Sequence, residues 1–208
     1  MKTMRIVPRI FTAAALVVSA TSCGNVVRSS RSPVILVVDS LAATRGSTTA
    51  GTPTANLASD VLTLVTSGGT CSTTNPCPTI FGDTGTLTLS LAPKDITTTG
   101  LTSNNQVTIN RIHVSYRRTD GRNTEGVDVP FSFDTASTVT VPTSGTVTAS
   151  FIIVRSQAKE ESPLVQLVNN GQLISAIADV TAFGADIVGN AVSATGSIGV
   201  TFGNFGDQ

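Results

Sequence analysis

The sequence has no tryptophan, one tyrosine and one histidine among its 208 residues, and only three cysteines. Glycan-binding sites usually present exposed aromatic side chains, so this scarcity counts against a glycan binder. A structural zinc site usually needs four cysteine or histidine ligands, so no metal and no cofactor are expected. Charged residues make up only 12% of the chain, and no basic stripe is visible. Nucleic-acid binding is therefore set aside.

The N-terminus carries the pattern of a secretory leader. Lys2, Arg5 and Arg9 form a basic stretch, an apolar run covers residues 10–20, and small residues then precede Cys23. The apolar run is shorter than the roughly 20 residues that a transmembrane helix needs. We therefore interpret it as a targeting segment and not as a membrane span.

The residues Ala20-Thr21-Ser22-Cys23 resemble the lipobox of bacterial lipoproteins, although the family more often has leucine where Ala20 stands. The resemblance implies a signal peptide over residues 1–22 and a lipid on Cys23 that attaches the protein to a membrane. Gly24 replaces the aspartate that can retain such proteins at the inner membrane, which favours an outer-membrane location. The alternative is an ordinary cleaved signal peptide followed by a chance cysteine.

The remaining chain divides into a short polar tether over residues 23–32 and one domain over residues 33–208. Loss of the leader removes three of the 13 basic residues and none of the 13 acidic ones, leaving 10 against 13. The mature protein is thus mildly acidic. The apolar block 34–38 predicts a strand buried on both faces, and the Thr-, Ser- and Gly-rich segment 42–59 predicts a long loop.

Alternation of apolar and polar residues predicts several strands with one face on a core. The clearest such segments are 87–91, 127–134, 147–153 and 192–202. Pro130 cannot donate a ladder hydrogen bond, so the second of these is expected at a sheet edge or beside a bulge.

A β-bulge, a hairpin turn and a helix complete the prediction. The alternation changes phase at Asn110-Arg111, which predicts a β-bulge, and Asp120-Gly121 predicts a tight hairpin. A short helix is expected with Ser162 as its cap, Pro163 at its first position and Gly171 as its stop. About eight or nine strands with one short connecting helix predict an all-β fold, an antiparallel sandwich of two sheets.

A family resemblance supports this architecture. Residues 186–190 look like the D-x-x-G-N turn of the closing hairpin in bacterial immunoglobulin-like domains, and residues 112–116 are similar to the third strand of fibronectin type III modules. The resemblance implies an immunoglobulin-like sandwich. The chain departs from the antibody pattern, since it lacks tryptophan and has no tyrosine before the final hairpin.

Cys71 and Cys77 are predicted to form a disulfide, because an exported protein meets an oxidising compartment. A redox or metal-binding pair is the alternative. His113 is expected to face solvent on a strand. Asp186 and Asn190 offer too few ligands for calcium and are interpreted as turn residues.

Asp83-Thr84-Gly85 resembles the D-T-G triplet of aspartic proteases, in which paired carboxyls share a proton. A chain with one such triplet would have to form a homodimer to supply the second carboxyl. The favoured interpretation is instead a turn in which Asp83 has no catalytic role.

Arg117, Arg118 and Arg122 surround the Asp120-Gly121 turn and form a candidate binding tip, although charges there can simply keep a hairpin soluble. The sequence thus predicts a lipid-anchored, non-catalytic binding or assembly module of the cell envelope, whose partners are the membrane and other envelope proteins. A surface adhesin or glycan binder is the alternative, and a hydrolase using Asp83 is a remote one.

Overall fold

The computed structural model describes residues 31–49, 51–95 and 100–206. The predicted signal peptide, Cys23 and most of the predicted tether lie outside these residues. The strands are β1 (Val34–Thr44), β2 (Asn56–Asp60), β3 (Thr63–Val65), β4 (Cys77–Thr79), β5 (Asp83–Pro93), β6 (Val107–Arg117), β7 (Phe133–Val141), β8 (Val147–Val154), β9 (Ile174–Asp186) and β10 (Ala191–Gly203). Three short helices accompany them: the 3-10 helices η1 (Ser103–Asn105) and η2 (Leu164–Asn169) and the α-helix α3 (Ser156–Glu160).

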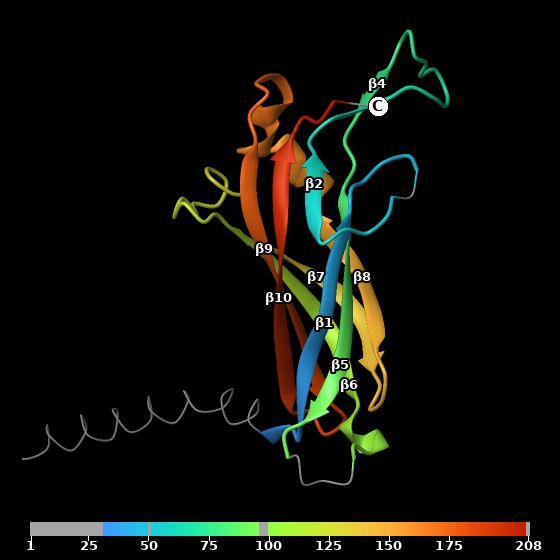
Figure 1. Ribbon diagram of the computed structural model, residues 1–208, viewed down its shortest axis with the longest axis vertical. Coiled ribbons are helices and arrows are strands. Elements are labelled where there is room, and N and C mark those ends of the chain that lie inside the picture. Colours follow the sequence, from blue (N-terminus) through green and yellow to red (C-terminus); the bar gives the residue numbers. More distant parts are fainter. Residues whose placement is uncertain (1–30, 50, 96–99, 207–208) are drawn as a thin grey trace, which may run out of the picture.

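Two sheets face each other and form an elongated sandwich, as expected (Figure 1). One sheet has three strands in the order β1-β5-β8, and the other has five in the order β2-β10-β9-β6-β7. The remaining strands, β3 and β4, form a separate two-stranded ribbon. The two main sheets therefore hold eight strands.

The strand order is that of an immunoglobulin-like sandwich. If β1, β5 and β8 are assigned to strands A, B and E, and β6, β9 and β10 to strands C, F and G, then each group is ordered as in that fold. In this assignment β7 extends the second sheet beyond strand C. One pairing departs from the antiparallel expectation, because β2 runs parallel to β10. The chain passes from one sheet to the other between β1 and β2.

The core lies between the sheets and is built from the inward-facing half of each alternating strand. Leu87 and Leu89 on β5 are fully buried, and small alanines line the inner face of β9. Tyr116 on β6 packs edge-to-face against Phe202, with ring centroids 5.9 Å apart. Its hydroxyl donates to the carbonyl of Ile153 on the opposite sheet. Tyr116 thus connects β6 with the opposite sheet through the core.

Two local predictions are confirmed. The pairing of β6 with both its neighbours shifts register between Ile109 and Arg111, which places the bulge at Asn110. β9 and β10 form the closing hairpin, in which Asp186 accepts hydrogen bonds from the backbone N–H groups of Val188 and Asn190.

The segment 118–132 was predicted wrongly. Asp120-Gly121 does not join two paired strands tightly, because β6 ends at Arg117 and β7 begins only at Phe133. The carbonyl of Thr124 accepts the N–H groups of residues 127–129. These local bonds fold most of the expected strand 127–134 into a turn, and Pro130 is buried within it.

Three further predictions need correction. β1 is buried on one face only, and Ile35 is 48% exposed, because its sheet packs on the core from one side. The loop expected over 42–59 shortens to residues 45–55, since β1 and β2 occupy its ends. The helix after Pro163 is 3-10 and not α, and Ser162 does not cap it. Its buried residues Leu164 and Leu167 are three apart, which matches the three residues per turn of a 3-10 helix.

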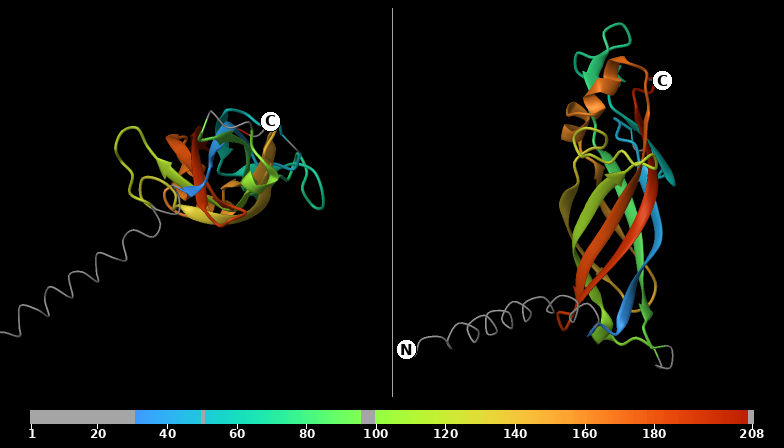
Figure 2. Two further views of the ribbon diagram at one scale, coloured as in Figure 1. Left: turned by 90° about the horizontal axis from the view of Figure 1, so that it is seen from below. Right: turned by 90° about the vertical axis from the view of Figure 1, so that its left-hand side faces the viewer.

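The connections between strands separate into two groups at opposite ends of the sandwich (Figure 1, Figure 2). At the entry end, where the chain enters β1, lie the described residues 94–95 and 100–106 and the connections 142–146 and 187–190. At the distal end lie the connections 45–55, 61–82, 118–132 and 155–173. Among the described residues, no helix has the length and apolar character required to cross a bilayer.

Candidate functional site

Asp83 does not lie in an exposed turn, contrary to the sequence prediction. It is the first residue of β5, and its side chain is completely buried together with that of Lys159 from α3. Lys159 Nζ lies 3.0 Å from Asp83 Oδ1. Since the two residues are 76 positions apart, the ion pair joins separate parts of the distal end.

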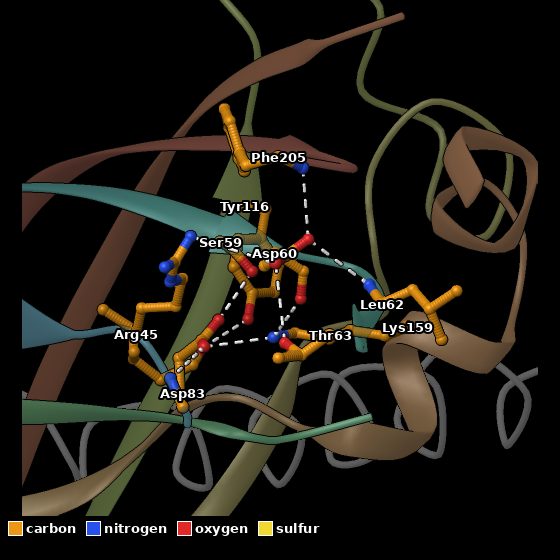
Figure 3. A network of polar contacts seen from close by, with 11 residues as sticks. Arg45, Ser59, Asp60, Leu62, Thr63, Asp83, Tyr116, Lys159 and Phe205 are labelled. Atoms are coloured by element: carbon orange, nitrogen blue, oxygen red, sulfur yellow. Dashed lines mark hydrogen bonds and ion pairs between the residues drawn. The ribbon is translucent and has the colours of Figure 1, made fainter. Parts of the chain in front are cut away.

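The ion pair is enclosed by further polar contacts (Figure 3). The Gly46 N–H donates to Asp83 Oδ1 at 2.8 Å, and the Ser59 hydroxyl donates to Oδ2 at 2.5 Å. Lys159 Nζ also donates to the carbonyl of Asp60 at 2.8 Å. Every one of these partners comes from the distal end, so the network ties its loops to the sandwich.

A second carboxylate, Asp60, borders the same network. Its Oδ1 accepts the backbone N–H groups of Phe205 at 3.2 Å and Leu62 at 3.4 Å, and its Oδ2 accepts the Thr63 hydroxyl at 3.5 Å. Arg45 approaches within 3.8 Å from the solvent side. Asp60 therefore fixes the C-terminal end of β10 and the start of β3 around itself.

Burial shifts both members of the ion pair toward their neutral forms. It raises the pKa of Asp83 above the ordinary value, against the opposing attraction of Lys159 and the hydrogen bonds from Gly46 and Ser59. Burial likewise lowers the pKa of Lys159, although the Asp83 carboxylate opposes this. Removal of one partner from such a pair typically costs about 3–5 kcal/mol, because the other charge stays buried alone.

The D-T-G triplet is explained by packing. Asp83 forms the buried ion pair, and Gly85 lies against the Phe151 ring on β8, where an added Cβ would come within 2.4 Å of a ring carbon. An aspartic-protease dyad needs two carboxyls that share a proton and reach substrate. Asp83 is instead sealed from solvent and bonded to an amine, so this geometry gives the hydrolase hypothesis no support.

The three arginines of the candidate tip do not form one cluster. Arg118 and Arg122 both bind Asp120, with nearest N–O distances of 2.6 and 3.0 Å. Arg117 points from β6 toward β9 and binds Asp179 at 2.6 Å. Hydrogen bonds from both neighbouring arginines hold the pKa of Asp120 well below its usual range. Each of these charges is thus already paired within the chain.

A groove opens beside this loop at the distal end, with a volume of about 220 Å³. It lies between the segment 118–132 and the η2 region. Two of its apolar lining residues are strongly exposed, Val127 at 65% and Leu173 at 58%. Arg118 and Arg122 form part of the same wall. The groove therefore combines exposed apolar area with paired charges.

Cys71 and Cys77 form the predicted disulfide, with their Cα atoms 5.3 Å apart. The bond closes the connection between β3 and β4, where Ser72 and Asn75 exchange backbone hydrogen bonds. This ribbon projects from the distal end beyond the sandwich (Figure 1).

The other sequence candidates have structural partners. His113 is half-buried on β6, and its Nδ1 lies 2.9 Å from Asp134, which also binds Arg111. The hydrogen bond with His113 is the main influence that lowers the pKa of Asp134. Asp186 and Asn190 bond to each other across the entry-end turn. Within the described part of the chain, no three acidic, histidine or cysteine side chains gather in a way that could hold a metal ion.

Lys159 is the residue of this network that no sequence pattern identified. It lies in Gln157-Ala158-Lys159-Glu160-Glu161, which has the composition of a solvated surface. No pattern within this segment signals burial. Only an independent sign that Asp83 was buried would have indicated a missing cation.

Comparison with known proteins adds no relative. No family model, no curated protein and no solved structure matches this chain.

Proposed function

We propose that the protein is a lipid-anchored, non-catalytic binding module of the cell envelope, attached to an outer membrane through Cys23 and bound to other envelope proteins through its distal end. The observation that carries this proposal is that the connections between strands form two groups at opposite ends of the sandwich. The disulfide ribbon and the groove-lining segments 118–132 and 155–173 all lie at the end farthest from the chain entry.

This arrangement suits a binding module because a rigid sandwich can hold variable loops in fixed positions. The Asp83–Lys159 pair holds the segments 45–55 and 155–173, and the disulfide closes the ribbon. The segment 118–132 is held by its own hydrogen bonds to Thr124 and by the ion pairs around Asp120. Such loops reach a partner with little loss of conformational freedom, which favours binding.

The lipid anchor is supported by the lipobox resemblance. Ser32 lies nine positions after Cys23, and an extended chain over that interval spans at most about 30 Å. The entry end would therefore stay close to the membrane, and the distal end would project away from it. Ile187 and Val188, which are exposed at the entry end, would face the lipid surface.

A protein partner fits the groove better than a glycan does. Exposed Val127 and Leu173 offer apolar area beside paired arginines, and protein interfaces combine an apolar centre with a polar rim. Among the large hydrophobic side chains that are exposed in the described residues, Phe131 is the one aromatic. The described surface therefore offers little aromatic area on which a sugar ring could stack.

The test is site-specific photocrosslinking in native membranes. A photoreactive residue at Val127 should trap a defined envelope protein, whereas the same residue at Val188 should trap none or only lipid. Crosslinking to the same protein from both positions, or to none from Val127, would refute the distal binding surface.

The anchor is tested separately. The Cys23→Ser protein should leave the membrane fraction, and the wild-type protein should carry acyl chains by mass spectrometry. A Cys23→Ser protein that remains in membranes, together with an unacylated wild type, would refute the anchor and leave the groove to be judged by crosslinking alone.

A further inference from the structure

The Asp83–Lys159 pair places a primary amine against a carboxyl group in a compartment closed to solvent. Both side chains are completely buried, and Nζ lies 3.0 Å from Oδ1. We propose that Lys159 and Asp83 condense into an intramolecular isopeptide bond after the chain has folded. The site of this modification is Nζ of Lys159 and Cγ of Asp83.

The surrounding groups suit this reaction. The Gly46 N–H donates to Oδ1 and the Ser59 hydroxyl donates to Oδ2, so both carboxyl oxygens have a donor to oppose negative charge as the amine attacks. The Asp60 carbonyl accepts from Nζ at 2.8 Å and holds the amine in place. Proximity of this kind replaces a slow encounter between two separate groups.

The reaction requires a neutral amine and a protonated carboxyl. One proton moved from Nζ to the carboxylate converts the ion pair into this state without exchange with solvent. Burial favours the change, since it raises the pKa of Asp83 and lowers that of Lys159.

The step balances without an oxidant or a co-reactant. The lone pair of Nζ attacks Cγ, and the new C–N bond gives a tetrahedral intermediate with a protonated nitrogen. Ser59 relays a proton from that nitrogen to Oδ2, by giving its own hydroxyl proton and accepting another. The carboxyl proton, which Nζ had given to Oδ1, passes to Oδ2 as the C–Oδ2 bond breaks. Oδ2 therefore leaves as water, and Oδ1 becomes the amide oxygen that still accepts from Gly46.

The product would link the start of β5 to α3 across 76 positions of sequence. It would also replace two buried charges by one neutral amide, which removes the desolvation cost of the ion pair. A crosslink between distant positions restricts the unfolded chain, so a covalent bond here would raise the denaturation midpoint.

The decisive measurement is the intact mass of the folded protein after reduction and alkylation of its cysteines. The wild type should weigh one water molecule less than the mass calculated for its mature, acylated and alkylated chain, and proteolysis should yield a branched peptide joining Asp83 to Lys159. The Lys159→Met and Asp83→Ala proteins should show the full mass. The matched control Lys94→Met, which changes a lysine at the entry end, should retain the loss.

The mass of the wild-type protein is sufficient to overturn the proposal. The test therefore remains decisive even when a variant fails to fold. Wild type at full mass, with Lys159 recovered in a linear peptide, excludes the bond. Water loss that persists in Lys159→Met, or that maps to another residue, excludes it as well. Ser59→Ala should slow the loss of mass that follows synthesis of the chain at least tenfold, and a loss that appears as fast as in the wild type would exclude the proton relay through Ser59.

Discussion

The two ends of the sandwich are stabilised in different ways, although the same strands run between them. At the entry end the connections 142–146 and 187–190 are short, and the second is closed by the side chain of Asp186. At the distal end the connections are long, and their regular elements are only the ribbon of β3 and β4 and the short helices α3 and η2. All of them except the segment 118–132 depend on a buried ion pair, a disulfide or a second carboxylate at Asp60.

The difference shows how each end is stabilised. A short turn is specified locally, because its few residues satisfy one another's backbone groups. A long loop cannot do this and must be fixed by contacts from elsewhere in the chain. The distal end should therefore respond strongly to the loss of single buried groups, whereas the entry end should respond modestly. The variants below test this difference in order of decreasing effect.

The largest effect is expected for Lys159→Met. The substitution leaves the Asp83 carboxyl buried without a partner, which should lower the free energy of unfolding by at least about 3–5 kcal/mol, the cost of a broken buried ion pair alone. Denaturant titration followed by circular dichroism measures the loss. The double variant Lys159→Met/Asp83→Leu should be more stable than Lys159→Met, because it removes the unpaired charge. A single variant within about 1 kcal/mol of the wild type would contradict the importance of the pair.

The disulfide should contribute less. Restricting the seven-residue loop from Cys71 to Cys77 stabilises by about 2.4 kcal/mol on a chain-entropy estimate. The Cys71→Ser/Cys77→Ser protein should lose up to this amount, and its amide exchange should accelerate first in β3 and β4. Uniform acceleration throughout the sandwich would instead show that the ribbon supports the core. Alkylation of the unreduced wild type, which should label neither cysteine, confirms that the bond is formed.

The entry-end turn should depend on pH. Burial alone would raise the pKa of Asp186, but hydrogen bonds from Asn190, Ser32 and Val188 lower it below the ordinary value of 3.8. The folded state thus binds its proton less readily than the unfolded chain, so the stabilisation is fully present above about pH 4 and is lost as pH falls through the lowered pKa.

Asp186→Asn should remove that part of the acid dependence and cost about 1–2 kcal/mol at neutral pH. Unfolding midpoints measured from pH 2 to 7 provide the test. An Asp186→Asn protein whose stability declines with acid as steeply as that of the wild type would disprove the assignment.

The smallest stability effects are expected at exposed apolar positions. Val127→Ser at the distal end and Val188→Ser at the entry end should each change stability by less than about 0.5 kcal/mol. They should differ in binding, because only Val127 lines the proposed partner surface. Co-purification from membranes should fall for Val127→Ser alone. Equal loss in both proteins would remove the functional distinction between the ends.

The sequence predicted those parts of the fold that depend on local pattern. Alternation located β5, β8 and β10, and the phase change located the bulge at Asn110. Residues 186–190 marked the closing turn because Asp186 bonds within its own turn. Each of these features is determined by residues that are neighbours in sequence.

The parts that depend on distant contacts were missed. Asp83 resembled a turn residue, and Lys159 a surface residue, because the partner of each lies 76 positions away. One local feature was missed as well, because Val127 and Phe131 alternate as strand residues do, yet hydrogen bonds to the neighbouring Thr124 favour a turn. The candidate arginines were correctly placed near a loop, but their pairing with Asp120 and Asp179 was not foreseeable from spacing alone.

The pairing of β1 with β5 has a mechanical consequence if the proposed lipid anchor holds the protein at its N-terminus. The two strands run antiparallel from Val34 opposite Pro93 to Thr44 opposite Thr84. A pull on Val34 toward the entry end, resisted at the distal end, acts along the strand axis and therefore perpendicular to the ladder hydrogen bonds. The bonds along β1 then bear the force together in shear instead of opening one after another. The first strand can thus transmit tension into the sandwich without unzipping from it.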